Sequence, residues 1–166
     1  MGFLDLFNPQ PTTPTVPSIL TDSAKRQIIS GQLPVLKPNN IFLKSGEICH
    51  YVDRAIFEKK TVRKKSIRKN RGYSVPGLFK GTRVHVGGGE TTSVDDVSYE
   101  TIKGILCVTN KRVLFVSSQE GFDKKVSDLI AVTPYANCIE LQFSKDIYKV
   151  FVPDGNIVFQ VLKLIQ

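Results

Sequence analysis

The sequence predicts a mainly β domain of about seven or eight strands that ends in one amphipathic helix. Three observations support this fold class. Short apolar segments recur between turn residues from Ile48 onward, two apolar runs face each other across Gly104 to Val116, and apolar residues from Ile157 to Ile165 repeat at helical spacing. A chain of 166 residues can bury a core of its own, so one domain with an extension is expected.

The first 40 residues are expected to form an N-terminal extension, and residues 41–166 the domain itself. The extension begins with a proline-rich stretch, which is typical of an extended linker. Thr21 or Asp22 can then cap a short helix with Ala24 to Ser30 as its body, and the glycine that follows can end it.

Strands are expected where β-branched and aromatic residues alternate with polar ones between turn signals. The expected strands are Ile48–Lys59, Thr61–Lys69, Gly81–Val86, Tyr99–Val108, Arg112–Ser118, Lys125–Val132, Cys138–Phe143 and Tyr148–Val152. In the first of them, alternation places Cys49, Tyr51, Asp53, Ala55 and Phe57 on one side. Three consecutive glycines at 87–89 predict a flexible loop that runs to about Asp96.

The clearest local pattern is Gly104 to Val116, GILCVTNKRVLFV. Two apolar runs flank Thr109-Asn110-Lys111-Arg112, which predicts a buried hairpin with a basic tip. Asn tolerates a left-handed backbone better than most residues, so Asn110 is expected to adopt that conformation in the turn.

This hairpin resembles the core hairpin of GRAM-like and bacterial pleckstrin-homology-like domains. Further pieces of the resemblance are Leu43 to Glu47, Lys80-Gly81, Gly121 to Val126 and the closing helix. The resemblance implies a small barrel whose end is closed by the helix, and a role in binding rather than catalysis. The closing helix of the family usually carries a tryptophan, whereas this chain has none, which points to a divergent bacterial-type or phage-type member.

The net charge of +8 is concentrated in Arg54 to Arg71, which holds nine basic residues and one acidic residue. Such concentration suggests an anionic partner. Within this segment, Lys69-Asn70-Arg71 with Lys64 and Lys65 upstream resembles the basic motif of lipid-binding pleckstrin-homology domains. The expected anion-binding residues are Lys59, Lys60, Arg63, Lys64, Lys65, Arg68, Lys69, Arg71, Lys80 and Arg83.

The expected partner of these residues is an anionic membrane surface or an acidic protein. Single-stranded or non-specific nucleic acid is the alternative, because Phe57, Tyr73 and Phe79 near the basic run could stack on bases. A third interpretation gives the lysines no ligand: they would only protect the edge of a solvated strand from pairing with other chains.

Catalysis is not expected, since the chain contains no recognisable nucleophile, zinc-protease or nucleotide-binding motif. No cofactor or metal is expected either, because the three cysteines and two histidines lack ligand spacing. Cys49, Cys107 and Cys138 are expected to be buried free thiols of a cytoplasmic protein, peripheral at the inner membrane face if it binds lipid. No apolar run is long enough for a transmembrane helix.

Overall fold

The computed structural model describes residues 13–70, 72–77, 79–81 and 83–166. Its contacts divide the chain into two units. We call the part up to Lys59 and from Thr101 onward the core unit, and Lys60–Glu100 the hairpin unit. Two long strands, β1 (Cys49–Asn70) and β4 (Gly89–Thr109), contribute residues to both units.

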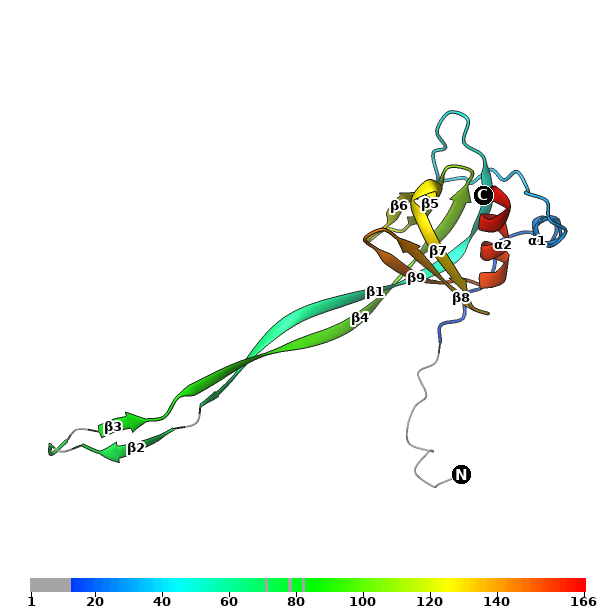
Figure 1. Ribbon diagram of the computed structural model, residues 1–166. Helices are drawn as coiled ribbons and strands as arrows, with labels where there is room; N and C mark the ends of the chain where they lie inside the picture. Colours follow the sequence, from blue (N-terminus) through cyan, green and yellow to red (C-terminus); the bar gives the residue numbers. More distant parts are fainter. Residues whose placement is uncertain (1–12, 71, 78, 82) are drawn as a thin grey trace, which may run out of the picture. The chain divides into compact units, whose positions relative to one another are not determined.

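One seven-stranded sheet contains all strands except a short pair in the hairpin unit, in the order β6-β5-β4-β1-β9-β8-β7 (Figure 1). The remaining strands of this sheet are β5 (Arg112–Val116), β6 (Phe122–Lys125), β7 (Leu129–Pro134), β8 (Cys138–Phe143) and β9 (Ile147–Phe151). The described pairings are antiparallel; Val108 lies opposite Val113, for example, and Ile56 lies opposite Phe151. A mainly β domain with a C-terminal helix is therefore confirmed.

Aromatic side chains from four strands fill the centre of the core unit. The ring of Phe57 on β1 contacts Phe115 and Phe122 edge-on, with centroids 5.7 and 5.8 Å apart. Phe122 in turn stacks on Tyr148 at 4.1 Å. Edge-on and offset contacts of this kind are favourable beyond the area that they bury. The alternation expected for the start of β1 is confirmed in part: Tyr51, Ala55 and Phe57 belong to this core, whereas Cys49 packs in a second cluster with Cys107 and Leu114.

Two helices pack on the sheet. Helix α2 (Gly155–Ile165) contacts β7 and β8, and helix α1 (Asp22–Ile29) contacts α2. Thr21 caps α1, since its hydroxyl accepts a hydrogen bond from the backbone N–H of Ala24 at 3.3 Å. The carboxylate of Asp154 caps α2 in the same way. Both helices were expected from their capping residues and apolar spacing, and both are confirmed.

The described part of the N-terminal extension packs against the sheet. Ala24 and Ile28 of α1 belong to the main core cluster. Ahead of the helix, the buried carboxylate of Asp53 on β1 accepts hydrogen bonds from the Ser18 hydroxyl and the Ile19 N–H, both at 2.6 Å. The extension therefore contributes to the core rather than only leading to it. The domain boundary at residues 40 and 41 stays a prediction.

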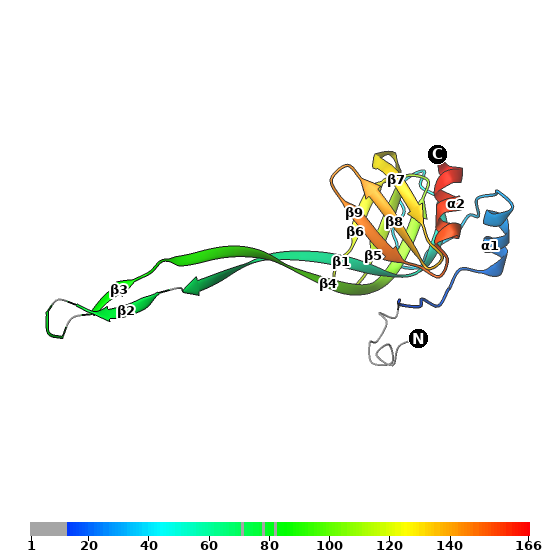
Figure 2. The same cartoon turned by 60° about the horizontal axis from the view of Figure 1, so that its bottom comes forward.

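The hairpin unit is a ribbon of two strands. The ends of β1 and β4 run side by side and twist about each other, and β2 (Tyr73–Pro76) pairs with β3 (Arg83–Val86) as a separate two-stranded sheet (Figure 2). No described side chain in this unit is buried. The described side chains of the unit therefore form no hydrophobic core of their own.

Three expected boundaries were wrong. The predicted strands Ile48–Lys59 and Thr61–Lys69 are one continuous strand, β1. The predicted loop after the three glycines is already β4 from Gly89. The predicted strand Lys125–Val132 is interrupted by one turn of 3-10 helix, η2 (Val126–Asp128). In the first two cases a two-stranded ribbon needs no buried face, so the sequence lacks the apolar alternation that reveals other strands.

Gly104 belongs to the hairpin that the sequence singled out, and the structure explains why a glycine stands there. A Cβ atom at this position would lie 2.4 Å from the carbonyl oxygen of Val116 and 2.7 Å from the ring of Phe115. The strands β4 and β5 approach too closely here for any side chain.

Candidate anion-binding strand

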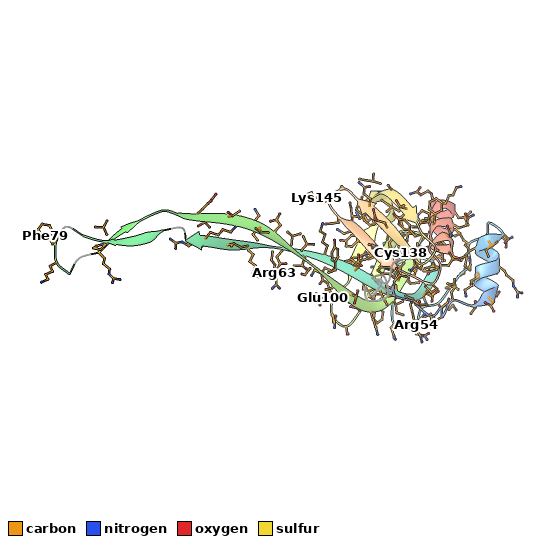
Figure 3. The ribbon with its side chains drawn as sticks, turned by 90° about the horizontal axis from the view of Figure 1, so that it is seen from below. Arg54, Arg63, Phe79, Glu100, Cys138 and Lys145 are labelled. Atoms are coloured by element: carbon orange, nitrogen blue, oxygen red, sulfur yellow. The ribbon has the colours of Figure 1, made fainter. Side chains whose placement is uncertain are left out.

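Most basic residues of β1 fall in the part of the strand that belongs to the hairpin unit; Arg54 and Lys59 lie in the core unit. The six in the hairpin unit are exposed, namely Lys60, Arg63, Lys64, Lys65, Arg68 and Lys69. Figure 3 shows side chains, among them Arg63, projecting from the ribbon into open space. Among the described residues, none of these six forms an ion pair. Their charges are therefore available to a partner.

The other predicted site residues differ in their surroundings. Lys59 is half-buried at the end of the core unit and forms an ion pair with Glu120. Lys80 and Arg83 are exposed in the hairpin unit. Arg71 lies outside the described residues. Six of the ten predicted residues are thus exposed together on β1, whereas Lys59 on the same strand is paired with Glu120.

Among the described residues, no strand pairs with one edge of β1 along this basic part. β9 pairs with β1 only from Ile56 to Glu58, and the other neighbour of β1 in the sheet is β4. The β4 part of the ribbon carries acidic residues instead, namely Glu90, Asp95, Asp96 and Glu100. Opposite charges on adjacent strands favour their pairing.

The aromatic residues expected to stack on bases are not all accessible. Phe57 is 7% exposed and belongs to the core, so its predicted role in stacking was wrong. Phe79 is 79% exposed, and the side chain of Tyr73 lies outside the described part. Two apolar side chains, Val62 and Ile67, lie exposed between the cations of β1.

The basic tip expected for the Gly104–Val116 hairpin is wrong for Arg112, because this side chain is buried. Its Nε donates to Oε1 of Glu47 at 2.7 Å, and its Nη1 donates to Oδ2 of Asp123 at 2.6 Å. Its Nη2 reaches Oε2 of Glu47 and the carbonyl oxygen of Phe42. Arg112 thus joins three segments of the core unit and is not offered to a ligand.

Glu47 is the buried partner in this network. Burial alone would raise its pKa, but hydrogen bonds from Arg112, the Lys44 backbone N–H and the Thr109 hydroxyl outweigh burial and lower the pKa from 4.5 to about 2. The carboxylate therefore stays ionised over the whole physiological range. Its role is to hold the turn before β1 against the turn between β4 and β5.

Asn110 supports the same junction, and not in the way expected. Among the described residues only glycines have a positive φ, so the predicted left-handed conformation of Asn110 was wrong. Its side-chain oxygen instead accepts a hydrogen bond from the Ile48 N–H at 2.8 Å, and its amide group donates to the Gly46 carbonyl at 3.2 Å. The residue is needed for its side chain rather than for its backbone.

The cysteines are buried free thiols, as expected. The sulfur atoms of Cys49 and Cys107 lie 3.3 Å apart on the adjacent strands β1 and β4. Hydrogen bonding to Cys49, together with burial, raises the pKa of the Cys107 thiol.

The sequence reasoning missed a second group of cations, Lys44, Lys111 and Lys125, which line one pocket of the core unit. They come from three separate turns or strand ends, so no run of charge marks them in the sequence. The only local signal was Lys111 in the hairpin pattern, which the sequence alone assigned to a turn.

Within the described residues, no helix is both long and apolar enough to cross a membrane. The chain matches no family model, no curated protein and no solved structure.

Proposed function

We propose that this chain is a non-catalytic module of the pleckstrin-homology or GRAM-like type, and that it binds an anionic membrane surface through the exposed basic part of β1. The element order supports the fold assignment, since a meander of antiparallel strands followed by one packed C-terminal helix is the order expected for these domains. The observation that carries the binding proposal is the row of six exposed cations without ion pairs among the described residues.

The chemistry of the strand supports a membrane as the partner. Lysine and arginine near an anionic lipid surface contribute roughly 1 kcal/mol each, so several are enough for peripheral attachment. Val62 and Ile67 lie exposed between them, and apolar side chains among cations suit the interface between headgroups and acyl chains. An acidic protein would also neutralise the charges, but it would not explain why Val62 and Ile67 are exposed among them.

The test is cosedimentation with vesicles of phosphatidylcholine with or without phosphatidylserine, at low and at physiological salt. We expect binding only to the anionic vesicles and weaker binding at higher salt. The variant K64E/K65E/R68E/K69E should lose about three orders of magnitude in affinity, because four contributions of roughly 1 kcal/mol disappear.

The matched control is K37E/K103E/K145E/K163E, which makes the same change of charge at exposed lysines of the core unit. The control should keep most of the binding. Equal loss in both variants would show that only the overall charge matters, and unchanged binding by the hairpin variant would refute the proposal.

Nucleic acid is the second candidate, and one observation favours it. A two-stranded β-ribbon fits the major groove of duplex DNA, and the hairpin unit is such a ribbon with exposed cations and an exposed Phe79. The acidic residues of its second strand count against a groove lined by phosphates. If duplex or single-stranded DNA displaces the protein from vesicles at sub-stoichiometric amounts, nucleic acid becomes the better assignment.

A further inference from the structure

One basic pocket of the described core unit is lined by none of the residues of the proposed function. Its volume is about 790 Å³, within the range of small-molecule sites. Its walls come from the turn before β1, the turn between β4 and β5, the end of β6, η2, and the end of α2. All of these elements belong to the core unit, so the pocket is formed without the hairpin unit.

Three lysines give the pocket its charge. Lys44 and Lys125 are exposed, and neither side chain has an ion-pair partner among the described residues. The Nζ atom of Lys111 donates to the carbonyl oxygen of Ser45 at 2.7 Å, a neutral partner that leaves its charge uncompensated. An ammonium group has three donors, so Lys111 retains two for a ligand.

The acidic groups nearby do not cancel these charges. Asp123 lines the pocket, but its carboxylate is bound to Arg112, which also pairs with the buried Glu47. This triad carries one excess negative charge against the three lysines. The three lysines therefore outnumber this excess, and they come from three separate segments of the chain, which suits a group that presents several anionic oxygens.

The remaining wall of the pocket is apolar. Val126 and Leu129 are buried and Ile165 at the end of α2 is partly buried, and all three line the pocket. The exposed Ser127, which follows Val126 in the chain, also lines the pocket and adds a hydroxyl group. A small inorganic anion would use only the lysines and would leave the apolar wall without a contact.

We propose that this pocket binds the phosphate group of an organic phosphate through Lys44, Lys111 and Lys125, with the organic part of the ligand against Val126, Leu129 and Ile165. The source is either a lipid headgroup that carries a phosphate monoester or a soluble phosphate monoester, since both present the same anionic oxygens. The site is independent of the basic part of β1.

The test is isothermal titration calorimetry of the full chain with three probes: inorganic pyrophosphate, glycerol 3-phosphate, and dihexanoyl phosphatidic acid below its micelle concentration. We expect all three to bind. The variant K44Q/K125Q should bind each probe about tenfold more weakly or worse, because two charge-assisted hydrogen bonds are lost.

The control K103Q/K145Q removes the same charge at exposed positions outside the pocket and should bind as the natural chain does. Tighter binding of the dihexanoyl lipid than of glycerol 3-phosphate, reduced by I165S, identifies a lipid ligand. Equal affinities identify a soluble phosphate. The proposal is overturned if no probe binds at millimolar concentration, or if K44Q/K125Q binds as well as its control.

The hairpin variant K64E/K65E/R68E/K69E separates the two proposals. It should retain pyrophosphate binding in the pocket even when it no longer sediments with vesicles. Loss of pyrophosphate binding in this variant, with retention in K44Q/K125Q, would place the phosphate on the hairpin unit instead and contradict the pocket.

Discussion

The two parts of β1 differ although the strand is continuous. In the core unit, alternate side chains such as Tyr51, Ala55 and Phe57 are buried, because helices and other strands cover that face. In the hairpin unit, no described side chain on either face of the same strand is buried. Strand geometry therefore decides only which side chains share a face. That face stabilises the fold only where a second layer of the protein covers it.

The same difference separates cations that are paired within the fold from cations that are not. The buried Arg112 of the core unit uses its donors on Glu47, Asp123 and a backbone carbonyl. Arg63 and Lys64 of the hairpin unit are exposed, with no ion pair among the described residues. A two-stranded ribbon alone is marginally stable in water, so its strands depend on their continuation into the core unit.

The largest expected effect comes from replacing one large apolar side chain by alanine on each of the two parts of β1. Phe57→Ala should destabilise the protein by about 4 kcal/mol, because it opens a cavity among three aromatic rings. Ile67→Ala, on the same strand but 44% exposed, should change the free energy of unfolding by less than about 0.5 kcal/mol.

Urea unfolding followed by circular dichroism measures both variants. A cost for Ile67→Ala that approaches the cost for Phe57→Ala would mean that the hairpin unit is covered in solution, and the distinction between the two units would be lost.

The next effect concerns the network of Glu47 and Arg112. Glu47→Gln should destabilise the protein by about 3 kcal/mol at neutral pH, because it breaks a buried ion pair. The pKa of Glu47 is lowered in the folded state, so its contribution is complete above pH 4.5 and is lost as the pH falls towards 2.

The difference in unfolding free energy between Glu47→Gln and the natural chain should therefore shrink between pH 5 and about pH 2. Unfolding curves at several pH values measure it. A difference that stays constant over this range would show that Glu47 does not titrate with the lowered pKa.

How far the sequence could predict this molecule depends on whether a feature has a local signal. The buried face of β1 up to Phe57 and the N-cap at Thr21 were predictable, because alternation and capping act over a few residues. The burial of Arg112 was not, since its partner Glu47 lies 65 residues away. The pocket lysines were missed for the same reason, as Lys44 and Lys125 meet only through the fold.

The exposed basic part of β1 was predictable as a cluster of charge, but its continuity with the preceding strand was not. Helix and strand predictions depend on buried residues, and Lys60 to Asn70 contains no described buried side chain. The acidic character of the β4 part was likewise hidden, because these residues were assigned in part to a loop.

A smaller effect is expected at Asn110. Asn110→Ala should destabilise the protein by about 1–2 kcal/mol, because two side-chain hydrogen bonds to the turn before β1 are lost. Asn110→Asp keeps the acceptor for the Ile48 N–H and should cost less. Thermal unfolding compares the two; a tolerated Asn110→Ala would show that the turn is held by Arg112 and Glu47 alone.

The most direct test of the central claim is hydrogen–deuterium exchange of the full chain, read by mass spectrometry with and without vesicles. In the free protein, amides of the core unit should exchange slowly and those of the hairpin unit rapidly. Anionic vesicles should slow exchange in peptides covering Lys60 to Asn70, and neutral vesicles should not. Protection that appears only in the core unit, or equally with both vesicles, would contradict the assignment of the basic part of β1 as the anion-binding surface.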